Sequence, residues 1–211
     1  MRYAFAKGAE VVFTVGDTLM EGRRRYVLTI DGKTTGMVGM LYPLRDIYKS
    51  YTDPSTHLPV RAVRNVQEQS YRDYKVDSFD RQTRSDSTIV TRETGEKIVL
   101  PRQVCDLVSL GYALRVKLSR APIAKGTMLH YPIYFNAEYL PFSVRCLGVE
   151  TIRTRFGKRK CYKFVPCIQK GEIFTENDAV TLWFAADGAY EPLRIEFKLF
   201  VGSMVCELVG T

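Results

Sequence analysis

The sequence is poor in the residues from which metal sites are usually built. Its 211 residues include only two histidines, His57 and His130, and none of its five cysteines forms a C-x-x-C pair. The spacings of zinc fingers and zinc ribbons are absent, so we expect neither a metal nor another cofactor. Isolated histidines on strands or turns are far more often hydrogen-bonded or solvated residues than catalytic bases.

The familiar catalytic and membrane-spanning patterns are also missing. No apolar run approaches the roughly 20 residues that a membrane-spanning helix needs. Ser109 is not set in G-x-S-x-G, and no glycine-rich phosphate loop opens a helix. Acidic residues are present, but the sequence cannot place any two of them about 5–9 Å apart, as glycoside hydrolysis requires. Catalysis is therefore unsupported, and a hydrolase or glycan-processing enzyme with a carboxylate pair stays open as an alternative.

What is present is an ordinary globular composition, 45% hydrophobic and 26% charged, which excludes whole-chain disorder. Neither a linker nor an internal repeat is visible, so we expect a single domain over residues 1–211. The first apolar run, Tyr3–Ala6, is interrupted by Lys7 and is shorter than the core of a signal peptide.

The aromatic content and the period-2 patterning point to β-structure. There are 25 aromatic residues (13 Tyr, 11 Phe and 1 Trp), and such residues favour pleated sheets. Arg25–Ile30 and Lys33–Leu41 flank the dipeptide Asp31-Gly32, a pattern typical of a tight hairpin turn. Further alternating segments follow on both sides of one helical stretch.

One segment has helical periodicity. Apolar or small residues recur on one helical face at Leu107, Leu110, Gly111, Leu114 and Leu118. Asp106 precedes them and can accept a hydrogen bond from an unpaired amide at the helix start. We therefore predict a helix over Asp106–Leu118 and a mainly β fold. The predicted architecture is one antiparallel, strongly curved sheet or partly open β-barrel, with the helix packed in or on it.

Two cysteines could be opposed in a hairpin. If Phe156-Gly157 is a two-residue loop, Cys146 faces Cys167, and directly opposed residues have Cβ atoms about 4.5–5.5 Å apart. A disulfide prefers about 3.5–4.5 Å, so a Cys146–Cys167 bridge is compatible with this register but not required by it. A three-residue loop would break the pairing, and buried thiols remain the alternative.

Positive charge is concentrated at the tip of the same hairpin. The formal net charge is +8. The basic residues around the turn are Arg153, Arg155, Lys158, Arg159 and Lys160. They either keep an exposed turn soluble or dock onto an anionic surface. No nucleic-acid-binding module accompanies them, so we expect no nucleic-acid partner and favour an anionic membrane surface.

Short strings along nearly the whole chain resemble one known family. They include Gly32–Gly36, Leu44–Asp53, Leu58-Pro59, Phe79-Asp80, Asp106–Ser109, Tyr112–Arg115, Gly148–Ile152, Phe156–Lys158, Cys161, Leu182-Trp183, Pro192 and Val201–Ser203. Their order and spacing resemble the family called domain of unknown function 3108, whose members occur in Gram-negative envelopes. Members carry a leader and a first strand ahead of the region matching Ala6–Phe13, so the resemblance implies that these are missing here.

The resemblance implies a periplasmic or envelope protein whose half-barrel is similar to lipoprotein-carrier folds. We therefore expect non-enzymatic binding of a lipid, a lipoprotein acyl chain or another apolar envelope ligand in the hollow of the barrel. The residues expected to line that hollow are Leu107, Leu110, Tyr112, Leu114 and Trp183. A scaffold that binds a partner protein by its sheet edge is a further alternative. The sequence does not specify the oligomeric state.

Overall fold

The computed structural model describes residues 2–5, 8–170, 173–176, 179–198 and 203–210. The chain divides into two compact units. One comprises Lys7–Ala113 and Pro132–Leu140, and we call it the β2–β8 unit. The other comprises Met1–Ala6, Leu114–Tyr131 and Pro141–Thr211, and we call it the β10–β15 unit.

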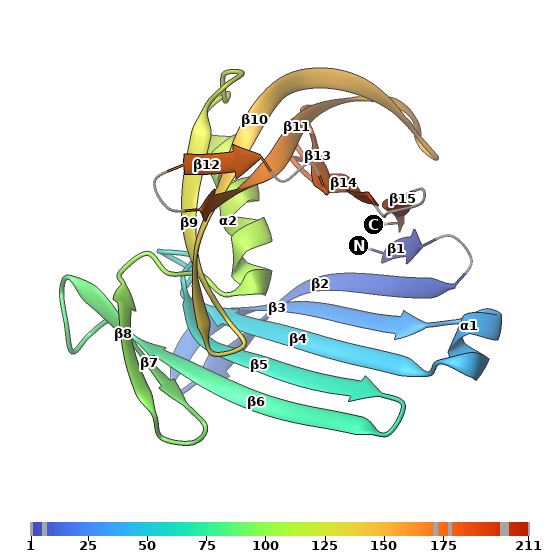
Figure 1. The fold of residues 1–211 in the computed structure, drawn as a ribbon. Helices are drawn as coiled ribbons and strands as arrows, with labels where there is room; N and C mark the ends of the chain where they lie inside the picture. Colours follow the sequence, from blue (N-terminus) through green and yellow to red (C-terminus); the bar gives the residue numbers. More distant parts are fainter. Residues whose placement is uncertain (1, 6–7, 171–172, 177–178, 199–202, 211) are drawn as a thin grey trace. The chain divides into compact units, whose positions relative to one another are not determined.

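The β2–β8 unit is built on an antiparallel sheet whose strands are neighbours in chain order (Figure 1). Its strands are β2 (Ala9–Met20), β3 (Arg23–Thr34), β4 (Leu44–Thr52), β5 (Pro59–Glu68), β6 (Tyr71–Asp80), β7 (Ser87–Arg92) and β8 (Lys97–Pro101). Phe79, Val90, Leu100, Val104 and Tyr134 form a buried cluster in this unit. Within the described residues the pairing path from β2 to β8 does not return on itself.

The β10–β15 unit has its own antiparallel sheet in the order β1-β15-β14-β13-β11-β10, with β12 paired to β11. The bounds are β1 (Arg2–Phe5), β10 (Glu138–Thr154), β11 (Gly157–Lys170), β12 (Ile173–Glu176), β13 (Val180–Ala185), β14 (Pro192–Lys198) and β15 (Ser203–Gly210). Strand β9 (Met128–Phe135) and strand β10 are each divided between the two units. The prediction of a mainly antiparallel β fold is confirmed, but the single sheet is not matched, because the strands form two sheets.

The predicted helix is confirmed as α2 (Leu107–Arg120). Asp106 caps it, since one carboxylate oxygen accepts hydrogen bonds from the backbone N–H groups of Val108 and Ser109, both at 2.8 Å. The Asp106 N–H in turn donates to the Ser109 hydroxyl at 3.0 Å, which completes a reciprocal cap. In the β10–β15 unit, Leu114 and Leu118 are buried with Phe164 and Phe184.

The predicted hairpin at Asp31-Gly32 is wrong, because both residues lie inside β3. Asp31 pairs with Val12 on one side and Ile47 on the other, and Gly32 pairs with Val11 and Asp46. A residue with a strand neighbour on both sides cannot occupy a chain reversal. The chain instead leaves the sheet after Thr34, and the next residues form a second, unpredicted helix, α1 (Gly36–Leu41).

The Cys146–Cys167 disulfide is also wrong. The β10–β11 turn is centred on Arg155-Phe156, since Thr154 pairs with Gly157, and a bulge between Cys146 and Gly148 shifts the register again. Cys146 therefore faces Phe164, and Cys167 faces Ser143. All five cysteines are buried thiols without a disulfide.

Candidate functional site

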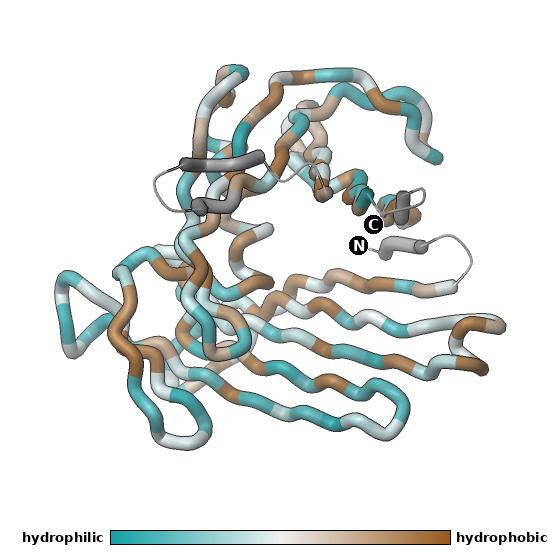
Figure 2. The backbone as a smooth tube through the Cα atoms, in the orientation of Figure 1, coloured by the Kyte–Doolittle hydropathy of each residue, from teal (hydrophilic) through white to brown (hydrophobic). Residues whose placement is uncertain are grey.

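The most exposed apolar surface of the β2–β8 unit is helix α1 with the residue that follows it. The exposed fractions are 77% for Met37, 47% for Val38, 85% for Met40, 80% for Leu41 and 44% for Tyr42. We call these five residues the α1 tip. None of the helix residues is buried, and the segment carries no charged side chain. Figure 2 shows the hydrophobic colouring of this segment. Contiguous apolar exposure of this kind marks an interaction surface.

The α1 tip is held firmly to the sheet although its side chains are exposed. The Thr34 hydroxyl donates to the Tyr42 carbonyl at 2.8 Å and accepts from the Leu44 N–H at 3.0 Å, so one side chain ties down the end of the helix. A Cβ on Gly39 would lie 3.0 Å from the Thr34 carbonyl oxygen, a tighter contact than most Cβ atoms make, so glycine favours this close approach. The apolar side chains are therefore presented by an ordered element.

Tyrosines border the same end of the sheet. Tyr71 and Tyr74 open β6 and are 54% and 58% exposed. Glu68 pairs with both Leu44 and Tyr71, which places the start of β6 two strands away from the end of α1 (Figure 1). Tyrosine combines an apolar ring with a polar hydroxyl, the combination that suits a boundary between water and lipid.

A second feature of the β2–β8 unit is a cleft of about 580 Å³ rich in arginine. Its cationic lining residues are Arg23, Arg25, Arg61, Arg81 and Arg102. Its acidic lining residues are Glu21, Asp53 and Asp80. Apolar side chains including Leu58, Val60 and Phe79 complete the walls. We call this feature the arginine cleft, and five guanidinium groups against three carboxylates leave it with an excess of positive charge.

Arg81 lies in the wall of the cleft without a carboxylate partner. Its guanidinium donates to the backbone carbonyls of Pro59, Arg102 and Val104, and it stacks over the ring of Phe79. Burial lowers the pKa of Arg81 to about 10, which still leaves it protonated at neutral pH. Its charge is thus solvated by carbonyl dipoles and is not neutralised.

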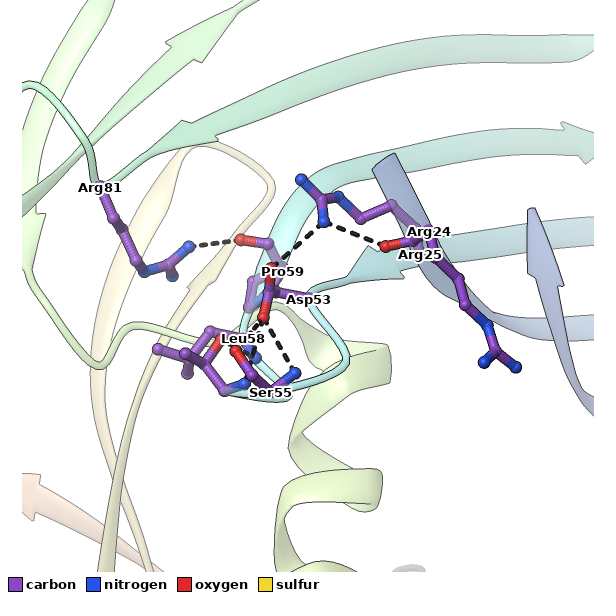
Figure 3. A network of polar contacts seen from close by, with 8 residues as sticks. Arg24, Arg25, Asp53, Ser55, Leu58, Pro59 and Arg81 are labelled. Atoms are coloured by element: carbon purple, nitrogen blue, oxygen red, sulfur yellow. Dashed lines mark hydrogen bonds and ion pairs between the residues drawn. The ribbon is translucent and has the colours of Figure 1, made fainter. Parts of the chain in front are cut away.

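Arg25 and Asp53 form the ion pair at the centre of Figure 3. An Arg25 Nη1 lies 3.2 Å from Asp53 Oδ2 and also donates to the Arg24 carbonyl. The hydrogen bond from the Ser55 hydroxyl is the main cause that lowers the pKa of Asp53, so the carboxyl is ionised. The Arg25 Nε–H is buried and has no partner among the described residues.

The five residues predicted to line an apolar hollow are not brought into one place within a unit. Leu107 is exposed and lines a space of about 40 Å³ with Tyr48 and Phe135, which is room for water but not for an acyl chain. Leu110 is half-buried, and Tyr112 packs edge-on against His57 in the same unit. Leu114 belongs to the core of the β10–β15 unit.

Trp183, the fifth predicted residue, also lies in the β10–β15 unit and has polar neighbours. Its indole N–H donates to Glu150 at 2.7 Å, and Lys163 and Arg194 lie over its ring. Their cation–π contacts, together with the Lys163–Glu150 ion pair, form a network of charged side chains around the Trp183 ring. Trp183 is therefore part of a structural network.

The five basic residues of the β10–β11 hairpin lie together as predicted. Arg153 pairs with Lys158 across the strands, and Lys160 is exposed opposite Thr151. Arg159 forms an ion pair with Asp187. Arg155 donates to the Val209 carbonyl at 3.2 Å. Arg159 thus has a carboxylate partner, and the uncompensated charge of the hairpin resides mainly on the other four.

The α1 tip and the arginine cleft were both missed by sequence reasoning. The unbroken apolar run Met37–Tyr42, closed by Pro43, is the signal that could have revealed the tip, because a half-buried strand should alternate. The arginine cleft gave only the Arg23–Arg25 run as a signal, since its other arginines are scattered through the chain. No helix in the part of the chain that the structure describes is long and apolar enough to span a membrane.

The two antiparallel strand arrays and the surfaces on them define a sheet-rich protein class. The chain belongs to the family described as protein of unknown function (DUF3108), whose sequence model matches residues 1–209. No curated protein matches the chain. The fold is similar to a β-barrel-like protein of domain of unknown function DUF1849 from Brucella abortus, with a TM-score of 0.58 and 9% identity, covering 96% of this chain and 86% of that one.

A DUF1089 family protein from Pseudomonas aeruginosa is more distantly similar, with a TM-score of 0.44 and 10% identity. That match covers 86% of this chain and 87% of the other. Together with the family match, the likeness to the Brucella protein establishes a β-barrel-like domain of unknown function.

Proposed function

We propose that this protein is a non-enzymatic envelope protein that binds lipid, or the acyl chain of a lipoprotein, at a membrane surface through the α1 tip. The observation that carries the proposal is the ordered exposure of Met37, Met40 and Leu41 at one end of a sheet. Moving one such side chain out of water contributes about 1.5–3 kcal/mol. Three of them supply roughly 5–9 kcal/mol before the cost of association is subtracted.

The size of the α1 tip favours lipid over a protein partner. A stable protein–protein interface buries about 800 Å² on each side and involves about 20–30 residues. The tip offers only five side chains, four on the six-residue helix α1 and that of Tyr42 directly after it. Insertion into the acyl–headgroup boundary has no such minimum area. Tyr42 of the tip and the flanking tyrosines Tyr71 and Tyr74 suit the headgroup level. This argues against the scaffold alternative at this surface.

Asp53 and Asp80 argue against placing the hydrolase alternative in the arginine cleft. A carboxylate pair needs one member whose pKa is raised, so that it can act as a general acid. The pKa of Asp53 is lowered chiefly by its hydrogen bond with Ser55, and that of Asp80 by its hydrogen bond with Thr83. Both carboxyls are therefore ionised at neutral pH and lack the proton that the first step requires.

The basic hairpin supplies a separate electrostatic contact in this proposal. Arg153, Arg155, Lys158 and Lys160 would attract anionic headgroups, each basic residue near such a surface contributing about 1 kcal/mol. Reversing Arg155, Lys158 and Lys160 to Glu should weaken binding to anionic vesicles at low salt. Equal binding would reduce the cluster to a solubility feature. The proposed setting is the Gram-negative envelope, and cell fractionation tests it.

Vesicle flotation tests the role of the α1 tip. We expect the intact chain to float with equimolar phosphatidylcholine–phosphatidylglycerol vesicles, and the double variant Met40→Ser/Leu41→Ser to show at least a tenfold lower partition coefficient. Val99→Ser is the matched control, since Val99 is an apolar residue of β8 that is 54% exposed. If the double variant and the control float alike, the α1 tip is not the lipid contact.

A further inference from the structure

The arginine cleft has the dimensions of a small-ligand site. Its volume of about 580 Å³ lies within the roughly 300–1,000 Å³ range of small-molecule pockets. All of its lining residues belong to the β2–β8 unit, from the β2–β3 turn, the loop before β5, the end of β6 and the segment after β8. The cleft is thus a feature of one compact unit.

The carboxylates of the cleft already have partners. Asp80 accepts hydrogen bonds from the N–H groups of Gln82 and Thr83, and Glu21 pairs with Arg61 at 3.3 Å. Asp53 is bound by Ser55 and Arg25. These contacts account for all three acids and leave arginines of the cleft without an anionic partner.

Three arginines of the cleft lack a carboxylate partner among the described residues. The side chain of Arg23 is exposed and makes no hydrogen bond or ion pair there. Arg102 donates only to the carbonyls of Arg81 and Arg84. Arg81 donates only to carbonyls as well, so its half-buried charge projects a positive potential into the cleft. Burying the charge of Arg81 without a counter-charge costs free energy, which a bound anion would offset.

We propose that the arginine cleft binds a phosphate group, carried by a small molecule or by a lipid headgroup. Arg23 and Arg102 donate to its oxygens, while Arg81 acts as a fixed positive charge in the wall. Guanidinium forks match phosphate oxygens in bidentate geometry, and a phosphate carries enough charge to engage more than one arginine. The apolar walls at Leu58 and Val60 accommodate the non-phosphate part of the ligand. This proposal does not depend on the role of the α1 tip.

Titration calorimetry at low salt tests the site with inorganic phosphate and with glycerol 3-phosphate as probes. We expect both to bind the intact chain, and Arg23→Gln/Arg102→Gln to bind at least tenfold more weakly. Arg72→Gln is the matched control: Arg72 is an exposed arginine of β6 outside the cleft, and its guanidinium likewise donates only to carbonyls, those of Gln69 and Tyr71. Equal affinities of the double variant and the control would overturn the proposal.

A second variant guards against a folding defect. Arg23→Gln replaces an exposed guanidinium that makes no hydrogen bond or ion pair among the described residues, so we expect this single variant to fold normally and its loss of phosphate binding to report on the site. A phosphate-induced rise in Tm that disappears in Arg23→Gln supports the site, and a rise that persists unchanged contradicts it.

The two sources of phosphate give different results. A free metabolite is indicated by two results together. Glycerol 3-phosphate binds more tightly than inorganic phosphate, and adding phosphatidylglycerol to phosphatidylcholine vesicles does not increase vesicle binding by an amount that Arg23→Gln abolishes. A lipid headgroup is indicated if phosphatidylglycerol does increase vesicle binding and Arg23→Gln abolishes that increase. The Met40→Ser/Leu41→Ser variant should keep its phosphate affinity, so failure of the lipid proposal and failure of this one are distinguishable.

Discussion

The buried carboxylate of Asp106 accepts a hydrogen bond from the hydroxyl of Ser50, which joins the start of α2 to the middle of β4. The same carboxylate caps the helix, so one side chain anchors α2 to the sheet of the β2–β8 unit. Ser50 is itself fully buried. The helix start is therefore fixed by tertiary structure as well as by its own cap.

Replacing Asp106 by Ala should destabilise the protein by about 2–3 kcal/mol, because it removes the cap and leaves the Ser50 hydroxyl unpaired. Asp106→Asn should cost less than about 1 kcal/mol, since asparagine caps helices as well as aspartate. Urea unfolding of both variants measures this difference. Equal losses would mean that the cap and the Ser50 contact contribute little.

The free energy of unfolding should fall with rising pH through the titration of Asp106. Burial is the main cause that raises its pKa above the ordinary 3.8. The native state then binds this proton more readily than the unfolded state, so the contribution of Asp106 is fully present below pH 3.8 and is lost as pH rises through the folded pKa. Asp106→Asn should flatten the decline in unfolding free energy above pH 3.8. An unchanged profile would contradict the assignment.

Asp53 should have the opposite pH dependence. Its pKa is lowered, chiefly by the Ser55 hydroxyl and further by Arg25, so it stabilises the fold above about pH 3.8 and loses this contribution as pH falls through the folded pKa. Asp53→Asn should cost about 1–2 kcal/mol at pH 7 and much less at pH 3. Urea unfolding at the two pH values gives the comparison, and an equal cost at both would exclude the mechanism.

The thiols should be unreactive in the native protein. Burial raises the pKa of Cys105 and of Cys206 to about 12 and that of Cys161 to about 11, so little thiolate exists at neutral pH. We expect slow modification by Ellman's reagent, and fast modification after unfolding. Intact-mass measurement with and without reductant should give the same mass. A gain of two daltons on reduction would show that the unreduced protein contains a disulfide.

Thr34→Val should loosen the α1 tip. The substitution removes the hydroxyl that holds Tyr42 and Leu44, so amide hydrogen exchange over residues 36–42 should accelerate, with a loss of about 1–2 kcal/mol in global stability. Thr14→Val, on the exposed part of β2, is the control and should leave exchange in that segment unchanged. No acceleration in Thr34→Val would show that the hydroxyl does not hold the tip.

The parts of this fold that could be predicted from the sequence are those set by residues close together in the chain. Helix α2 was predictable because Asp106 and the leucine spacing act within one or two turns. The Asp31-Gly32 pair misled, because its turn preference is weaker than the pairing of β3 with strands on both sides. The bulge at Leu147 and the turn at Arg155-Phe156 set the β10–β11 register, and neither leaves a clear sequence signal.

The candidate sites depend on topology, which a single sequence does not display. Arg23 and Arg102 are separated by most of the β2–β8 unit in sequence and reach one cleft only through the sheet order. The α1 tip is a local run, but its exposure follows from the way Thr34 and Gly39 hold the helix away from the core. Hydrophobicity alone would assign such side chains to the interior.

The burial of the native thiols permits a direct measurement at the tip. Leu41→Cys can be labelled selectively with an environment-sensitive nitrobenzoxadiazole probe, with Thr94→Cys in the exposed β7–β8 turn as the reference site. We predict a blue shift and an increase in emission at position 41 on addition of phosphatidylcholine–phosphatidylglycerol vesicles, with no change at position 94. Unchanged emission at position 41 would contradict the claim that the α1 tip enters lipid.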